Sequence, residues 1–149
     1  MRSPEQLAMA EATSYLARRE YTAAELTSKL ATKHGDSSSQ AVVNRLVEAG
    51  IVSDERAVEA MLYKLTDRKI VGDSEIRAKL EQLGIGRDEA DQIIAIQVAP
   101  EIDRANQLVL KRFEKGATPP KIGRFLYSRG FDESTIESVL ENLPRTESE

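Results

Sequence analysis

Three pairs of adjacent carboxylates are the residues of this sequence best suited to chemistry: Asp54-Glu55, Asp88-Glu89 and Asp132-Glu133. Neighbouring carboxylates can hold a divalent cation or share acid and base roles in catalysis. Each pair, however, lies at the start of a predicted helix, where acidic side chains cap free N–H groups and complement the helix dipole. We therefore interpret the pairs as helix starts and expect neither a catalytic site nor a metal site there.

Few other side chains could act as a nucleophile or a metal ligand, because cysteine is absent and His34 is the only histidine. The absence of cysteine excludes disulfides, thiolate metal sites and thiol nucleophiles, and it is typical of a reducing cytosol. His34 precedes Gly35 at the end of a predicted helix, where a basic side chain suits the dipole. An enzyme is therefore the class of protein that the sequence supports least, and no cofactor is expected.

Basic residues are concentrated between residues 111 and 129, although the whole chain has a net charge of −4. The negative net charge argues against a protein that mainly coats nucleic acid. A run of charge usually forms a solvated helix face, but it can also dock an acidic partner or phosphate groups. The candidate contact residues are Lys111, Arg112, Lys115, Lys121, Arg124 and Arg129, followed by Arg18 and Arg19, which the helix dipole alone would justify.

The sequence contains no signal for a membrane. No apolar run approaches the roughly 20 residues that span a bilayer. The first residues, Met1 to Glu5, lead into a helical pattern and do not resemble a signal peptide. We expect a cytoplasmic protein with no membrane partner.

One short pattern occurs three times and indicates the elements that position these side chains. It begins at positions 25, 75 and 121, so the copies are 50 and then 46 residues apart. A period in this range is typical of like units that stack to share a core. The copies are Glu25-Leu26-x-x-Lys29-Leu30, Glu75-Ile76-x-x-Lys79-Leu80 and Lys121-Ile122-x-x-Phe125-Leu126, and the last two are followed by Gly84-Ile85 and Gly130-Phe131.

Capping residues and glycines divide the chain into nine predicted helices. The first is expected to run to about Arg19, with Leu7 in its apolar stripe. No stretch alternates with a period of two, so no sheet is predicted. The signals that start helices are Ser3, Thr22, Ser37, Ser53, Asp73, Arg87, Pro100, Thr118 and Asp132.

These signals predict an all-α protein of three tandem three-helix repeats, stacked into an elongated, curved molecule. A single unit of about 45 residues is near the lower limit for independent folding, so neighbouring units are expected to pack together. The predicted units are residues 1–50, 51–99 and 100–143, followed by a polar tail at 144–149.

Several stretches of the chain resemble the RecX family, the regulators of the bacterial recombinase RecA. Each stretch alone is a weak motif, but their order, spacing and recurrence form a fairly specific combination. The resemblance covers roughly residues 10–143. It is carried by Tyr15–Leu30, Leu46–Ala57, Glu75–Ile85 and Arg124–Phe131.

The resemblance implies three tandem helical repeats that bind in the groove of the RecA–DNA filament. There the family caps or destabilises the filament, and so damps strand exchange, ATP hydrolysis by RecA and cleavage of the SOS repressor. It implies no catalytic residue and no cofactor. The leading hypothesis is therefore a non-enzymatic, monomeric inhibitor whose partners are the RecA filament and the single- or double-stranded DNA within it.

Two other hypotheses stay open from the residues alone. Three-helix units resemble helix-turn-helix packing in outline, so the chain could be a helical DNA-binding module that acts independently of RecA. It could also be a helical scaffold for another protein. A steep loss of DNA affinity with added salt, measured without RecA, would favour the DNA-binding module.

Overall fold

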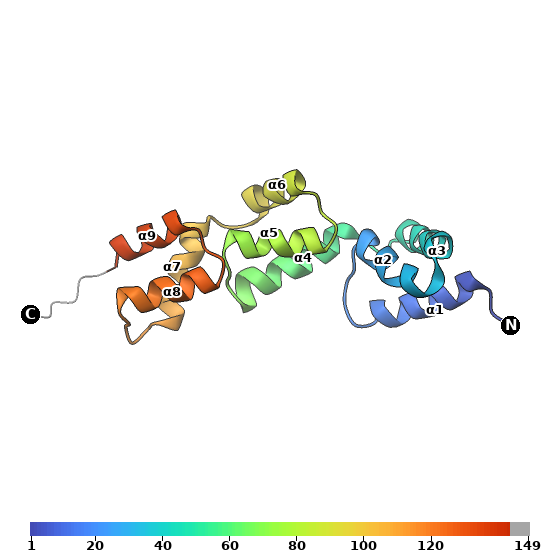
Figure 1. Cartoon of the computed structure of the whole chain (residues 1–149), viewed down its shortest axis with the longest axis horizontal. Helices are drawn as coiled ribbons and strands as arrows, with labels where there is room; N and C mark the ends of the chain where they lie inside the picture. The colour runs from blue at the N-terminus through green and yellow to red at the C-terminus, as the bar shows by residue number, and fades with distance from the viewer. Residues whose placement is uncertain (144–149) are drawn as a thin grey trace, which may run out of the picture. The chain divides into compact units, whose positions relative to one another are not determined.

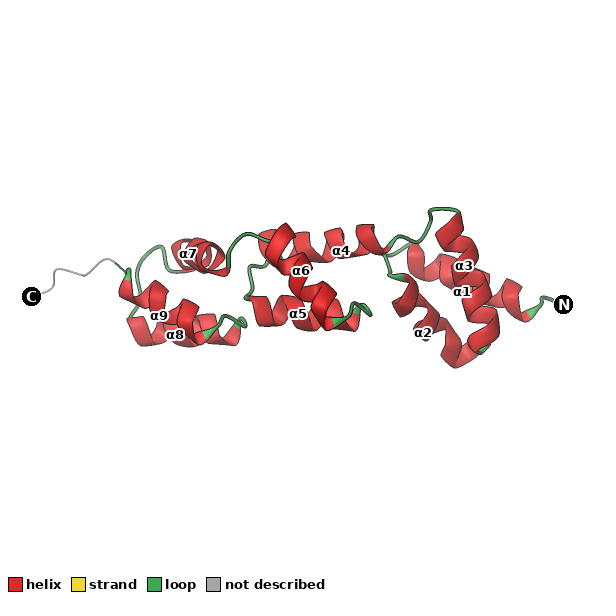
Figure 2. Ribbon diagram, turned by 90° about the horizontal axis from the view of Figure 1, so that it is seen from above, coloured by secondary structure: helices red, strands yellow, loops and turns green. Residues whose placement is uncertain are grey.

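The computed structural model of the chain describes residues 1–143, and these residues form α-helices joined by short loops (Figures 1 and 2). No strand occurs in this range, so the all-α prediction is confirmed. The polar tail predicted at 144–149 lies outside the described residues. The elements are α1 Pro4–Leu16, α2 Ala23–His34, α3 Asp36–Glu48, α4 Asp54–Tyr63, η1 Lys64–Arg68, α5 Asp73–Gln82, α6 Arg87–Gln97, α7 Glu101–Arg112, α8 Pro119–Ser128 and α9 Glu133–Glu141.

The predicted capping residues explain where the first two helices begin. The Ser3 hydroxyl accepts a hydrogen bond from the Gln6 N–H, and the Gln6 side chain accepts one from the Ser3 N–H. Thr22 and Glu25 form the same reciprocal capping box at the start of α2. Each box satisfies backbone donors that a helix start would otherwise leave free.

The recurring glycine and apolar residue end α5 and α8 in the same way. Gly84 and Gly130 have φ angles of 88° and 83°, which are strained for residues with a side chain. The N–H of the next residue, Ile85 or Phe131, donates to a carbonyl five residues earlier, at Leu80 or Leu126. This is the Schellman arrangement, in which glycine lets the chain turn out of the helix.

The first helix differs from its prediction at its end and in its apolar stripe. It ends at Leu16: the Ala17 N–H still donates to the Thr13 carbonyl four residues earlier, but the Arg18 N–H donates to the Tyr15 carbonyl only three residues earlier, which tightens the last turn. Leu7 is 47% exposed, whereas the small residue Ala8 beside it is fully buried. Arg18 and Arg19 therefore follow α1 instead of ending it.

A π-helical segment, η1, continues directly from α4 and was not predicted. The hydrogen bond typical of this wider turn joins the N–H of Lys69 to the carbonyl of Lys64, five residues earlier. Leu65 stays buried in this segment. No residue type in η1 distinguishes it from an α-helix, so a periodic pattern could not reveal it.

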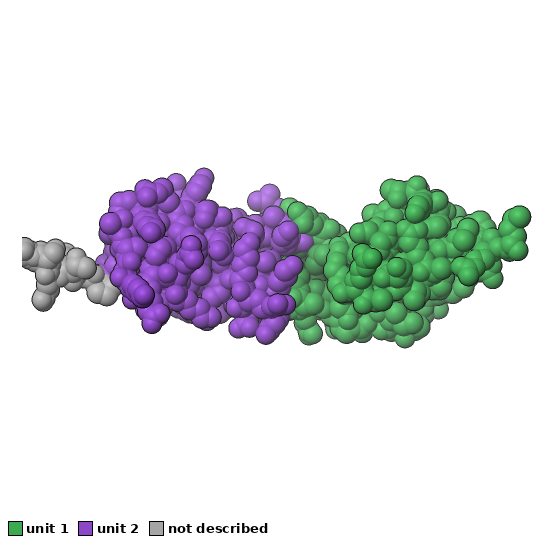
Figure 3. All heavy atoms as spheres, turned by 90° about the horizontal axis from the view of Figure 1, so that it is seen from below, with its two compact units in different colours: residues 1–61, 80–85 green, residues 62–79, 86–149 purple. Residues whose placement is uncertain are grey.

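The chain forms two compact units (Figure 3). Unit 1 comprises Met1–Met61 and Leu80–Ile85, and unit 2 comprises Leu62–Lys79 and Gly86–Glu149. Three α-helices fall in each of the ranges 1–50, 51–99 and 100–143, but the division into three repeat units stays a prediction.

Each unit has its own apolar core. In unit 1, α1, α2 and α3 pack against one another, and in unit 2, α9 packs against α7 and α8. The core of unit 1 contains Ala8, Ala12, Tyr21, Leu26, Leu30, Val42, Val43, Leu46 and Val52. The core of unit 2 contains Ile70, Ala105, Leu108, Val109, Ile122, Leu126, Phe131 and Val139.

Candidate partner-binding surface

The six basic residues predicted as contacts in segment 111–129 lie on and between two helices of unit 2. Two end α7, one lies in the following loop, two lie on α8, and one directly follows α8. Five of the side chains are exposed and one is half-buried. We call the following six residues the basic surface: Lys111, Arg112, Lys115, Lys121, Arg124 and Arg129.

Phe125 holds two of these arginines in place. The guanidinium carbons of Arg112 and Arg129 lie 5.2 and 4.9 Å from the centroid of its ring. Phe113 meets the same ring edge-on at a centroid distance of 5.3 Å. A cation over an aromatic face is attracted by about 0.5–1 kcal/mol at an exposed site. The phenylalanine pair therefore belongs to the packing of unit 2 and also orients two of its cations.

A shallow hollow of about 320 Å³ brings four members of the basic surface together. Its remaining lining includes Phe113, Gly116 and one carboxylate, Glu114. Arg124 lies outside both this hollow and the group around Phe125. We call the following four residues the basic hollow: Lys111, Arg112, Lys115 and Lys121.

No member of the basic surface has an ion pair with a carboxylate in residues 1–143. In unit 1, by contrast, Arg45 and Arg56 pair with Glu5 and Glu20. Like charges held close together without counter-charges repel one another, and an anionic partner relieves this repulsion. The basic surface can therefore attract carboxylates or phosphates.

The two other predicted contact residues, Arg18 and Arg19, lie in unit 1 and differ from each other. Arg19 donates to the Glu25 carboxylate at 2.7 Å and stacks 3.7 Å from the centroid of the Tyr21 ring. The hydrogen bond to Glu25 raises the pKa of this guanidinium. Arg18 is exposed, and its side chain has no hydrogen bond or ion pair within the described chain. Arg19 thus has a structural role, and Arg18 is the freer of the two.

One member of each of two acidic pairs, and His34, make structural contacts. Asp54 accepts a hydrogen bond from the Ala23 N–H at 2.8 Å. Asp132 caps α9, and hydrogen bonds from Ser134 lower the pKa of this carboxyl. His34 Nε2 lies 2.6 Å from a carboxylate oxygen of Glu11. In the described part of the chain, no three histidine, aspartate or glutamate side chains are arranged to hold a metal ion.

Sequence reasoning did not identify the polar network at the start of α7. Arg104 is only 3% exposed, and its guanidinium donates to Asp73 Oδ1 at 2.7 Å and to the carbonyl oxygens of Val71 and Ala99. Within residues 1–143 its Nε has no acceptor. A helical pattern offers no signal for it, because a charged residue beside Ala105 is read as exposed.

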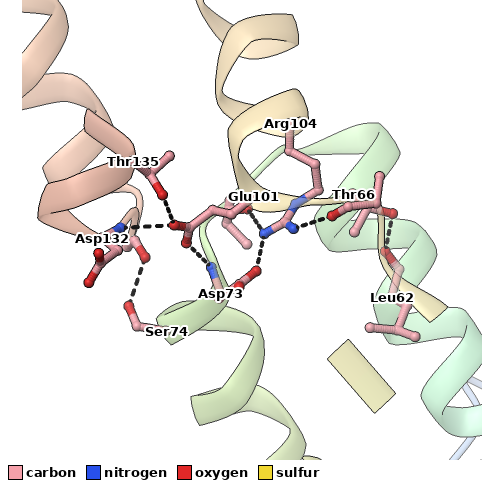
Figure 4. Close-up of polar contacts among 11 residues, drawn as sticks. Leu62, Thr66, Asp73, Ser74, Glu101, Arg104, Asp132 and Thr135 are labelled. Atoms are coloured by element: carbon pink, nitrogen blue, oxygen red, sulfur yellow. Dashed lines mark hydrogen bonds and ion pairs between the residues drawn. The ribbon is translucent and has the colours of Figure 1, made fainter. Parts of the chain in front are cut away.

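Glu101 completes this network and joins the starts of two helices (Figure 4). One of its carboxylate oxygens accepts from the Asp73 N–H of α5 at 2.7 Å. The other accepts from the Asp132 N–H at 3.3 Å and from the Thr135 hydroxyl at 2.5 Å, both at the start of α9. Each helix start thereby gains an acceptor for a donor that it would otherwise leave free.

Curated relatives named Regulatory protein RecX match most of the chain. The protein from Leptothrix cholodnii is 33% identical over 137 residues, which cover 87% of this chain and 84% of the relative. The protein from Acidithiobacillus ferrooxidans is 36% identical over 136 residues, with coverages of 84% and 83%. The chain belongs to the RecX family. The protein from Chromohalobacter salexigens, 33% identical over 136 residues with coverages of 87% and 88%, is a further RecX relative.

The fold is also that of a solved RecX structure. The crystal structure of RecX from Lactobacillus salivarius superposes with a TM-score of 0.72 and covers 94% of this chain and 96% of that chain. Only 18% of the aligned residues are identical, so this comparison establishes the fold alone. No family model matches the chain. None of the described helices is both long and apolar enough to cross a membrane.

Proposed function

We propose that this protein is a non-enzymatic regulator that binds the RecA–DNA filament and inhibits its extension. Membership in a family named for regulation supports the proposal, and the resemblance described above names RecA as the family's target. Binding then lowers ATP hydrolysis by RecA, strand exchange and the SOS coprotease activity. The protein acts in the cytoplasm as a monomer and without a cofactor.

The basic surface is the observation that supports a filament contact most directly. Its six cations share segment 111–129 with a single carboxylate, Glu114. A RecA–DNA filament offers two kinds of anion, the carboxylates of the protein and the phosphates of the DNA. Long-range attraction speeds the encounter, while the fixed positions of Arg112 and Arg129 over Phe125 favour a defined contact.

The first experiment adds the protein to RecA filaments already formed on single-stranded DNA. We expect slower ATP hydrolysis and shorter filaments, measured by a coupled assay and by electron microscopy. Unchanged hydrolysis at a protein concentration equal to that of RecA would contradict the proposed function. DNA binding without RecA, with a steep salt dependence, would instead favour an independent DNA-binding module.

A second arm tests the basic surface. Replacing Lys111, Arg112, Lys115 and Arg124 by Ala should weaken inhibition at least tenfold while leaving the far-ultraviolet circular dichroism unchanged, a loss of about 1.4 kcal/mol. The control variant removes the same charge from exposed Arg2, Lys33, Lys64 and Lys69. Equal inhibition by the two variants would exclude the basic surface as the contact.

A further inference from the structure

Two segments of the chain have the same burial pattern, and a third segment departs from it. Residues 21–30 and residues 71–80 agree position by position in which residues are buried, half-buried and exposed. The matching segment of the third copy, residues 117–126, keeps Ile122 and Leu126 buried, but Ala117 is only half-buried. The first residues of this segment depart from the shared burial pattern: Thr118 is exposed, whereas Thr22 at the matching position is only 1% exposed. The third copy therefore lacks whatever covers the other two.

In unit 1 the cover consists of a carboxylate and a glycine turn. Asp54, the first residue of α4, accepts from the Ala23 N–H at 2.8 Å. The Thr22 hydroxyl donates to the Leu83 carbonyl oxygen at 2.5 Å. A Cβ on Gly84 would lie 2.7 Å from the Cβ of Ala24, so this turn approaches the start of α2 closely.

In unit 2 the same two components cover the start of α5. Glu101, the first residue of α7, accepts from the Asp73 N–H at 2.7 Å. The Gly72 N–H donates to the Arg129 carbonyl oxygen, and the Ser74 hydroxyl donates to the Gly130 carbonyl oxygen, each at 2.8 Å. Each unit thus presents an acidic side chain and a turn rich in carbonyl groups to the start of a helix.

The start of α8 keeps the register of these two sites but changes their chemistry. Pro119 stands where Ala23 and Asp73 supply an N–H, so no backbone donor is available there for a carboxylate. The Thr118 hydroxyl does not cap its own helix. Lys121 replaces Glu25 and Glu75 and is part of the basic hollow. The donors near the start of α8 are thus side-chain ammonium groups, where the other two copies have a backbone amide.

We propose that Thr118, Pro119 and the basic hollow form a receiving surface for an acidic polypeptide segment of a partner protein. A carboxylate of that segment occupies the place of Asp54 and Glu101 and is held by Lys121 and Lys115. The Thr118 hydroxyl donates to a backbone carbonyl of the segment, as Thr22 does to Leu83. This inference rests on the proposed function, and it assigns the contact at this surface to protein carboxylates and not to DNA phosphates.

Carboxylates are favoured over phosphates by the two sites that are already filled. Both hold an aspartate or glutamate together with a peptide carbonyl, and the second of these groups is absent from DNA. The basic hollow is also small, with a volume of about 320 Å³, whereas a site that follows a DNA strand needs a groove along which successive phosphates can lie.

The test measures binding of fluorescein-labelled probes to the full chain by anisotropy at low salt. The probes are a short peptide of Glu, Gly and Ser, the same peptide with Gln for Glu, and oligo(dT) of equal charge. We expect the Glu peptide to bind, the Gln peptide not to bind, and the variant Lys115→Glu with Lys121→Glu to lose at least tenfold in affinity, about 1.4 kcal/mol. Thr118→Val should lose a smaller factor.

The control variant, Lys64→Glu with Lys69→Glu, has the same net charge and alters exposed residues that are not members of the receiving surface. Equal binding of the Glu peptide by both double variants would overturn the receiving surface. It would also be overturned if oligo(dT) bound more tightly than the Glu peptide and only the changes at Lys115 and Lys121 abolished that binding. If the peptide fails to bind while RecA filaments are still inhibited, the receiving surface is wrong and the proposed function stands. If the peptide binds as expected but filaments are unaffected, the proposed function alone fails.

Discussion

At the scale of single residues, Arg104 is a buried charged side chain that holds parts of unit 2 together. A buried guanidinium is tolerated only when its hydrogen bonds replace those to water, and this one has acceptors for both terminal nitrogens. Two of the acceptors are the backbone carbonyls of Val71 and Ala99 and one is Asp73, so the side chain ties α7 to the start of α5 and to the loop that leads into α7. Its absence would leave the carbonyl of the buried residue Val71 without this donor.

Arg104→Met is therefore expected to lower the free energy of unfolding by about 3 kcal/mol, because it removes one partner from a buried charged pair. The matched control is Arg45→Met, which breaks the exposed pair with Glu5 and should cost less than about 1 kcal/mol. Urea unfolding followed by circular dichroism measures both. Similar losses in the two variants would show that burial of Arg104 contributes nothing beyond its charge.

At the scale of elements, the starts of α2 and α5 depend on close approach between backbones. Gly72 precedes α5, and a Cβ there would collide with the carbonyl oxygen of Gly130. The equivalent position in unit 1 holds Thr22, whose side chain instead donates to a carbonyl. The residue before the helix can therefore make this contact in two ways, through a side-chain hydrogen bond as at Thr22 or through direct contact between backbones as at Gly72.

Gly72→Ala should destabilise unit 2 by about 3 kcal/mol, the upper part of the usual range for overpacking, because backbone atoms cannot move aside as a side chain can. Gly86→Ala is the control, since nothing lies within 4 Å of its added Cβ. It should cost less than about 1 kcal/mol, the usual effect at a helix N-cap. Thermal unfolding measures the difference, and equal shifts would contradict the collision.

Much of the helical arrangement could be predicted because its signals are local. The boxes at Ser3 and Thr22 and the turns at Gly84 and Gly130 each depend on residues a few positions apart. The end of α1 was predicted too late, because helix endings leave weaker signals than helix starts. Arg104 could not be predicted, because its burial depends on acceptors about 30 residues away in the sequence.

For the candidate surface, the sequence predicts which residues are basic but not how their side chains are arranged. The concentration of cations in 111–129 is visible in the sequence, but the pairing of Arg112 and Arg129 over Phe125 is not. Likewise, the sequence does not distinguish Arg19, which pairs with Glu25, from Arg18, which is exposed. Whether these residues contact a partner stays a prediction.

At the scale of the whole molecule, the two units have separate cores and should respond separately to a local change. Arg104→Met is expected to speed amide hydrogen exchange in α7, in α9 and at the start of α5, because all three meet at its network. Exchange in α1, α2 and α3 should stay as in the wild type. Mass spectrometry of peptic fragments measures both, and an equal increase throughout would show that the chain opens only as one cooperative unit.

The divided carboxylate of Glu101 also restricts how this chain can change over evolutionary time. Its two oxygens serve the starts of α5 and α9 at once. Aspartate is shorter by one methylene and cannot reach both helix starts at once, and glutamine replaces one acceptor by a donor, so either replacement disturbs at least one helix start in a single step. Position 101 therefore offers few neutral single substitutions, and a successful replacement there would need compensating changes around Asp73 and Thr135 together.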